Sequence, residues 1–301
     1  MIDLDRLTTE QRNAATLHID ELSVSDMLRT IHDEDRKVFE AVENALPMIA
    51  RAVEIIAVRL KKGGRLFYLG AGTSGRLGIL DAVECPPTFG TNPELVQGVI
   101  AGGMNAVFRA QEGAEDSLTL AQEDLRERSL SSSDVLCGIA ASGRTPYVVG
   151  GLDYARSLGA ATIAVACTPA SPIAALADVS ITAVTGPEVI TGSTRLKAGT
   201  AQKIILNMLS TGAMIRLGKV YGNLMVDVKS SNAKLEERAR RIVMEATERS
   251  RAEAEEALAK ASGSAKLAIL MLLANLSVEE ARRQLDAADG YIRHALKGGF
   301  S

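Results

Sequence analysis

The sequence predicts an α/β protein: a doubly wound, parallel sheet of five strands flanked by helices, with a small all-α domain at the C-terminal end. Short apolar runs recur through the first two thirds of the chain, and most lack the alternation of a half-exposed strand, which is typical of strands covered on both faces. Helical stretches separate the runs, as in parallel strands joined by right-handed crossovers. From about Asn232 the sequence becomes charged and alanine-rich, a composition that favours helices.

The elements are expected in a regular order. Residues 1–40 are polar and mixed, and are predicted to form an arm rather than a folded unit. A helix follows, in which apolar residues from Val42 to Leu60 recur at spacings of three and four, and Gly63-Gly64 ends it. Strands are expected at 65–69, 95–100, 134–140, 161–166 and 179–184, and further helices at 76–83, 115–128, 146–158 and 194–217.

We therefore predict three parts: the arm at 1–40, a sheet domain at 41–231 and a helical domain at 232–301. Gly263, Asn275 and Gly290 are expected to separate three or four helices in the last part. Its apolar run from Leu267 to Leu273 predicts a surface that packs on the neighbouring domain.

Composition limits the classes of function. Of the 301 residues, 47% are apolar, enough for a substantial core. The net charge is −3 and no run of Lys and Arg is present, so the sequence has no basic surface of the kind that binds nucleic acid. Met1–Asp5 carries acid where a signal peptide needs positive charge, and no apolar run approaches the roughly 18 residues that span a bilayer. Cys85, Cys137 and Cys167 are expected to be buried free thiols. We expect a cytoplasmic protein without nucleic-acid or membrane partners.

A glycine-rich turn follows the first predicted strand. Gly70, Gly72 and Gly75 form a turn that opens a helix, where free backbone amides stabilise an anion. Their spacing also fits the dinucleotide fingerprint, which requires an acidic residue at the end of the second strand. Here the candidate, Glu94, precedes that strand, and Cys85-Pro86-Pro87 is expected to cut the helix short. A nicotinamide site is therefore disfavoured.

The third predicted strand is followed by a second turn of the same kind. Its sequence Ser142-Gly143-Arg144 repeats Ser74-Gly75-Arg76 of the first turn. Ligands of a doubly wound sheet bind beyond the carboxyl ends of the strands, so two hydroxyl-bearing turns there predict one phosphate site. Two unrelated helix caps are the alternative, because Ser and Thr are favoured caps. A third polar segment, Gly186–Lys197, points to the same edge. The predicted ligands are Gly72, Thr73, Ser74, Ser142, Gly143, Thr145, Ser193 and Thr194.

These segments resemble a known family. The two turns resemble the sugar isomerase (SIS) domain, which binds phosphosugars, and Gly186–Lys203 resembles the signature shared by the glucokinase regulatory protein and bacterial N-acetylmuramic acid 6-phosphate etherases. Ala14 is one departure, since the etherase family commonly has Pro there. Similarity to the etherases runs through nearly the whole chain, in Thr9–Asn13 with Ile19-Asp20, Leu69–Gly90, Glu112–Asp116 and Ser231–Leu235.

The resemblance implies a lyase without a cofactor. It would cleave the lactyl ether at C3 of N-acetylmuramic acid 6-phosphate, by elimination and then hydration, in the catabolism and recycling of cell-wall amino sugars. It assigns Glu84 as the acid for lactate departure and Glu115 as the base at C2, whereas the residues alone leave these two roles open. Lys234 becomes a phosphate ligand, and a homodimer is expected.

Two alternatives stay open. One is a non-catalytic phosphosugar sensor like the glucokinase regulatory protein, which carries two SIS units where one is visible here. The other is an aldose–ketose phosphate isomerase, which also needs a carboxylate at C2. His18, His32 and His294 show no metal spacing and are expected at the surface, and Cys85 has no neighbouring histidine to activate it as a nucleophile.

Overall fold

The computed structural model describes residues 8–227 and 233–298, so Met1–Asp5, Ser231 and Asn232, which entered the predictions, lie outside the described residues. The chain divides into two compact units. The first holds the residues up to Val83 together with Glu94–Ser210, and the second holds Glu84–Pro93 together with the residues from Thr211 onward. Each unit is described by itself below.

The first unit is built on the predicted sheet. Its strands are β1 (Leu66–Gly70), β2 (Val96–Ile100), β3 (Val135–Ile139), β4 (Ala161–Ala166) and β5 (Val179–Thr182). They are parallel and lie in the order β2-β1-β3-β4-β5, with Leu66 opposite both Val96 and Val135. All five strands begin and end within two residues of the predicted positions, because continuous apolar runs mark strands that are buried on both faces.

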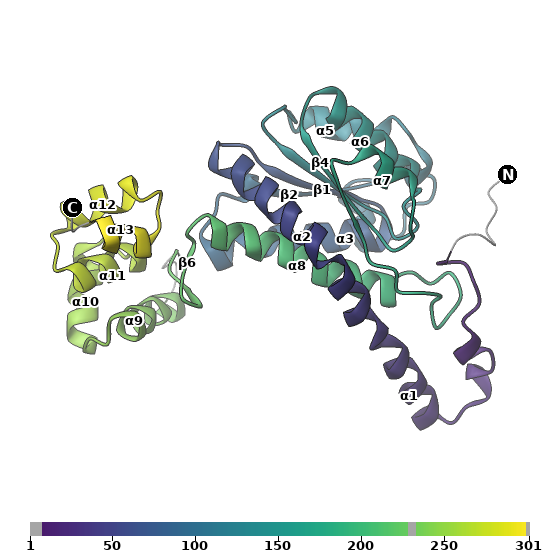
Figure 1. The fold of residues 1–301 in the computed structure, drawn as a ribbon, viewed down its shortest axis with the longest axis horizontal. Helices are drawn as coiled ribbons and strands as arrows, with labels where there is room; N and C mark the ends of the chain where they lie inside the picture. Colours follow the sequence, from purple (N-terminus) through teal and green to yellow (C-terminus); the bar gives the residue numbers. More distant parts are fainter. Residues whose placement is uncertain (1–7, 228–232, 299–301) are drawn as a thin grey trace. The chain divides into compact units, whose positions relative to one another are not determined.

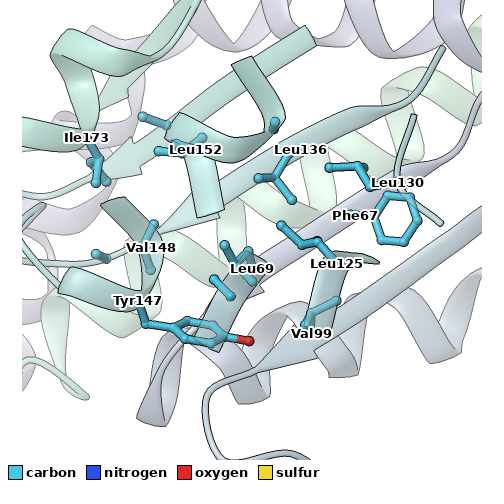
Figure 2. Packing of buried hydrophobic residues seen from close by; sticks show 14 of the residues in the cluster. Phe67, Leu69, Val99, Leu125, Leu130, Leu136, Tyr147, Val148, Leu152 and Ile173 are labelled. Carbon is cyan, nitrogen blue, oxygen red and sulfur yellow. The ribbon is translucent and has the colours of Figure 1, made fainter. Parts of the chain in front are cut away.

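Helices cover both faces of this sheet. On one face, α5 (Leu120–Glu127), α6 (Pro146–Ser157) and α7 (Pro172–Leu176) pack on a core that includes Phe67, Leu69 and Leu136 (Figure 2). On the other face lie α2 (Lys37–Lys61), α3 (Gly72–Phe89) and the first part of α8 (Lys197–Arg216) (Figure 1). The doubly wound arrangement is confirmed. The short elements of the unit are η4 (Pro93–Leu95), α4 (Asn105–Phe108) and η5 (Ala114–Asp116).

The N-terminal segment is more ordered than an arm. It contains the 3-10 helices η2 (Ala14–Thr16) and η3 (Ile19–Glu21) and then α1 (Val24–Asp35). Ser23 caps α1, since its Oγ accepts a hydrogen bond from the Asp26 amide. Asn13, Thr16 and Glu34 are buried, so part of the segment is fixed against the rest of the unit.

Two predicted helix boundaries were wrong. Pro86 and Pro87 lie inside α3 and do not end it, since the fixed φ of proline is compatible with a helix even though each proline lacks an amide donor. The Gly90 amide still donates to the Pro86 carbonyl at 2.9 Å, and Glu84 therefore lies inside a helix rather than on an irregular turn. The helix expected at 115–128 is broken, because Ser117 Oγ accepts from the Leu120 amide and starts α5 separately.

The second unit is helical. It contains a hairpin of β6 (Val220–Tyr221) and β7 (Leu224–Met225), followed by five helices among its described residues. Gly263, Asn275 and Gly290 have positive φ and separate helices as predicted, but the break near Ser250, which caps the second helix, was missed. The helices are α9 (Ala233–Thr247), α10 (Arg251–Lys260), α11 (Ala265–Ala274), α12 (Val278–Ala287) and α13 (Ile292–Gly298).

Helix α11 is the core of this helical unit. It packs against α9, α10, α12 and α13, and Leu267, Ile269 and Leu270 are buried among them. The apolar run was predicted to face the neighbouring domain, and this was wrong: a helix that is apolar all round is a central helix. Among the described residues no single helix is long and apolar enough to span a membrane, although α10 and α11 pass that test together across a bend of 115°.

Candidate active site

The candidate site lies at the carboxyl ends of the strands of the first unit. The chain leaves β1 for β2 on one side, and the next strand, β3, pairs with β1 on the other side. The topological switch point is therefore between β1 and β3, where ligands of doubly wound sheets bind. The two Ser-Gly-Arg turns lie in the segments that follow these strands, 71–76, which includes the first turn of α3, and 140–145; they are called the first and second loops below.

Gly72 and Gly75 in the first loop are glycines for different structural reasons. Gly72 has a φ of +53°, and a β-carbon there would meet no atom within 4 Å. Gly75 is needed for packing, because a β-carbon there would lie 2.5 Å from Ile100 Cγ1. Strand β2 ends at Ile100 and is followed by Ala101 and Gly102, so the carboxylate that a dinucleotide site requires is missing at that position.

Ser74 lies on the first turn of α3 and is buried. Its hydroxyl donates a hydrogen bond of 2.8 Å to Gln202 Oε1 on α8. One turn earlier in α8, a β-carbon at Gly199 would lie 3.4 Å from Thr73 Cγ2 and 3.4 Å from the Thr194 carbonyl oxygen. The structure therefore brings the first loop and the third polar segment together, as predicted.

The second loop is shaped by Gly143. Its φ is +65°, and a β-carbon there would overlap Ser171, so the loop packs directly on the segment after β4. Ser142 Oγ accepts from the Arg144 amide at 3.4 Å, whereas Thr145, the residue before α6, makes no side-chain capping bond. Because Thr145 does not cap α6, the alternative of a simple helix cap loses support at the second loop.

The third segment differs from the other two in its electrostatics. The Glu188 carboxylate accepts hydrogen bonds from the amides of Lys197 (3.0 Å) and Ala198 (2.9 Å), at the start of α8. Burial raises the pKa of Glu188, and the two amides oppose that shift. These amides are therefore occupied by a carboxylate of the protein itself. Ser193 and Thr194, the two predicted ligands of this segment, lie in the turn before α8.

A buried ion pair between Lys197 and Glu34 connects this segment to α1. Lys197 Nζ lies 2.7 Å from Glu34 Oε2, and neither residue is exposed by more than 3%. Asn13 donates to Glu34 at 2.7 Å and to the Pro187 carbonyl at 3.1 Å, and Thr16 donates to the Val189 carbonyl. The N-terminal segment is thus bonded to residues 187–197. None of these contacts was predicted, because the partners are far apart in the sequence.

Another unpredicted cluster surrounds Asp81 on α3. This carboxyl is 6% exposed and accepts hydrogen bonds from the Tyr68 hydroxyl, Asn207 and Ser210 at 2.9–3.1 Å. Burial raises its pKa, and the three donors oppose that shift. The cluster fastens α3 to β1 and α8, three residues before Glu84 in the same helix.

The predicted catalytic carboxyls are both exposed. Glu115 lies in η5, which packs against α6, and the preceding loop is tied to α3 because Arg76 Nε donates to the Val107 carbonyl at 2.9 Å. Glu84 lies on α3 and Lys234 on the first turn of α9; both belong to the second unit, whose position relative to the first is not determined (Figure 1). Lys234 lines a hollow of about 550 Å³ together with Arg238 and Arg241.

The predicted exposure of the histidines and burial of the cysteines are confirmed. His18, His32 and His294 are exposed, and the three cysteines are buried and not in disulfides. Burial raises the pKa of Cys167 to about 12, and it also raises that of Cys137. Among the residues that the structure describes, no group of three His, Cys, Asp or Glu side chains is arranged to hold a metal ion.

Family models match three parts of the chain. Residues 48–156 match the glucokinase regulatory protein N-terminal SIS domain, and residues 118–212 match the SIS domain. Residues 222–266 match the C-terminal lid domain of glucokinase regulatory protein. Both the sheet and the helical region are therefore similar to known domains.

Curated relatives match along the full length. A protein of Photobacterium profundum named N-acetylmuramic acid 6-phosphate etherase is 59% identical over 298 residues, which cover 99% of this chain and 99% of the relative. One of the same name from Clostridium beijerinckii is 57% identical, covering 98% and 97%. Among solved structures, a phosphoheptose isomerase from Francisella tularensis is 15% identical, covers 64% of this chain and 100% of its own, and has a TM-score of 0.49.

Proposed function

The chain belongs to the family of N-acetylmuramic acid 6-phosphate etherases, and on that premise we propose how its own residues carry out the reaction. The enzyme is a carbon–oxygen lyase that cleaves the D-lactyl ether at C3 of N-acetylmuramic acid 6-phosphate. The products are N-acetylglucosamine 6-phosphate and D-lactate. The observation that carries the assignment of its site is the pair of Ser-Gly-Arg loops at the switch point between β1 and β3.

The loops bind the phosphate group. Hydroxyls of Thr73, Ser74, Ser142 and Thr145 and the amides around Gly72 and Gly143 are the donors, and a phosphate accepts charge-assisted hydrogen bonds from such groups. Ser193 and Thr194 add hydroxyls from the third segment, which the contact of Gly199 with Thr73 supports. Lys234 is a further proposed phosphate ligand and supplies a positive charge. Anchoring the phosphate in this way fixes C2 and C3 of the open-chain sugar.

The chemical step needs a base and an acid. In the open-chain aldehyde the C2 proton is acidified by C1, and Glu115 removes it. Lactate then leaves from C3, and Glu84 gives the proton that its oxygen requires. Water adds to the conjugated aldehyde at C3, which restores the hydroxyl of N-acetylglucosamine 6-phosphate. General acid–base help of this kind is worth about 10²–10⁴-fold per group. We assign no cofactor to these steps.

The setting of the enzyme is also part of the proposal. We propose a cytoplasmic homodimer with a small phosphosugar as its binding partner, acting in cell-wall amino sugar recycling. The net charge of −3, with no basic run in the sequence, argues against nucleic acid as a partner.

The function is tested by incubating the purified protein with N-acetylmuramic acid 6-phosphate and measuring D-lactate. We expect catalytic release of one lactate for each N-acetylglucosamine 6-phosphate formed. A phosphosugar sensor would bind the substrate without releasing lactate, and an aldose–ketose isomerase would yield a ketose phosphate instead. Either result would refute the etherase assignment.

Glu84→Gln is expected to slow D-lactate release by about 100-fold, because the amide cannot donate a carboxylic proton to the leaving oxygen. Exchange of the C2 proton with solvent deuterium, followed by NMR, should persist in this variant because Glu115 is intact. Glu123→Gln, which removes an exposed carboxylate on α5, is the control and should release lactate at the normal rate. Normal release by Glu84→Gln would show that the acid is a different group.

A further inference from the structure

The side chain of Gln202 is buried beside the phosphate loop. Only 1% of the residue is exposed, and its Oε1 accepts the hydrogen bond from Ser74 at 2.8 Å. Its Nε2 is also buried and has no hydrogen-bond partner among the described residues. A buried amide donor without a partner is rare, because it loses its bond to water and gains none in return. The orientation of this amide, with Oε1 bonded to Ser74 and Nε2 left without a partner, therefore needs an explanation.

The direction of the Ser74 hydrogen bond matters for phosphate binding. A serine hydroxyl has a single proton, and in the bond to Oε1 that proton points to Gln202. A phosphate group offers only acceptors at neutral pH, apart from any proton of its own. Ser74 can bind it strongly only if its proton is turned toward the phosphate. An acceptor at position 202 thus competes with the ligand for the same proton.

A glutamine side chain can resolve this competition by rotation. Turning the amide by 180° exchanges Oε1 and Nε2 with almost no change in shape, so that Nε2 donates to Ser74 Oγ. The Ser74 proton is then available to the phosphate, and the atom left without a partner is a carbonyl oxygen, which is tolerated better than an orphan N–H. The position of Gln202 one turn after Gly199, on the part of α8 that contacts Thr73, keeps this amide against the loop.

We propose that Gln202 is a positioning residue that directs the Ser74 hydroxyl: its amide donates to Ser74 Oγ, and the hydroxyl proton goes to the substrate phosphate. This inference rests on the proposed function, because it needs Ser74 as a phosphate ligand. It predicts that Gln202 acts on substrate binding through Ser74 and leaves the chemical step unchanged.

The test compares two replacements of Gln202, one that only accepts and one that neither accepts nor donates. Gln202→Glu keeps the shape and offers Ser74 only acceptors, so we expect KM to rise about 10- to 100-fold, as in Ser74→Ala, with kcat within about threefold. Gln202→Met leaves the proton free, so KM should rise only about threefold. If Gln202 merely accepts from Ser74 to hold the fold, the order is reversed, with Glu harmless and Met damaging.

The charge introduced by Gln202→Glu is controlled in the Ser74→Ala background. There we expect Gln202→Glu to raise KM by less than about threefold, because no hydroxyl remains to be turned. A rise of 10-fold or more in that background would show simple repulsion of the phosphate and overturn the inference. If Gln202→Glu does not fold, Gln202→Met decides alone, and a rise in KM above 10-fold in it contradicts the proposal.

The outcomes separate this inference from the function on which it rests. Absence of lactate release by the wild type would refute the proposed function. Release with an unchanged KM in Ser74→Ala would remove Ser74 as a phosphate ligand and the inference with it. Release with a raised KM in Ser74→Ala and the reversed order of the Gln202 variants would refute the inference only.

Discussion

Glu115→Gln should abolish the two steps that come directly after ring opening, removal of the C2 proton and departure of lactate. Without the base the C2 proton is not removed, so solvent deuterium does not enter at C2 and lactate is not expelled. We expect loss of activity by about 10³-fold or more, near the upper end for one acid–base group, because the elimination depends on that proton transfer. Exchange at C2 followed by NMR and D-lactate release measure the two steps separately.

The controls for Glu115 come from the same part of the fold. Glu123→Gln on α5 removes another exposed carboxylate and should keep both activities. Glu115 is exposed, so its replacement should leave the unfolding midpoint unchanged, and a lost activity is then not a lost fold. Exchange at the wild-type rate in Glu115→Gln would mean that a different residue is the base.

The sheet was predictable because its information is local. Most of the strands are continuous apolar runs, and burial on both faces is what produces such a run, as at β3 and β4, where no residue of the strand is exposed. The wrong predictions concerned helix boundaries, where a single sequence rule was applied without regard to the surrounding residues. Pro86 and Pro87 lie inside α3 because proline tolerates helical φ, and Ser117 divides a stretch that hydrophobic spacing alone predicts as one helix.

Only those parts of the candidate site that are formed by neighbouring residues in the sequence could be predicted. The loops at Ser74 and Ser142 follow strand ends, and the topology of a doubly wound sheet brings such ends to one edge. Gln202 and Ser74 are 128 residues apart, and Glu34 and Lys197 are 163 apart. Nothing in the hydrophobic pattern marks these partners, because a buried charge or amide is recognised by its satisfied hydrogen bonds in three dimensions and not by its neighbours in sequence.

The buried pair of Glu34 and Lys197 links the N-terminal segment to the start of α8. Glu34 on α1 holds Lys197 at the first residue of α8, and Glu188 holds the amides of the same turn. Lys197 and Gln202 both lie on α8, within two helical turns of each other. The N-terminal segment therefore stabilises the start of the helix from which Gly199 and Gln202 face Thr73 and Ser74 in the first loop.

Lys197→Met is expected to destabilise the protein by about 3–5 kcal/mol, because it leaves the Glu34 carboxylate buried without its main partner. Removing both charges, in Glu34→Leu with Lys197→Met, should cost less than the sum of the single changes, since no uncompensated charge remains. Urea unfolding followed by circular dichroism measures the three free energies. Additive losses would show that the two charges do not stabilise each other.

The pH dependence of unfolding gives an independent check of the same pair. Burial alone would raise the pKa of Glu34, but hydrogen bonds from Lys197, Lys37 and Asn13 outweigh it and lower the pKa from 4.5 to about 2. A lowered pKa contributes stability that is complete above the unfolded value and is lost as the pH falls through the folded one, here between pH 4.5 and about 2. The contribution is about 3 kcal/mol. Glu34→Gln should lack this part of the acid-induced loss, and an acid transition identical to that of the wild type would contradict the role assigned to the pair.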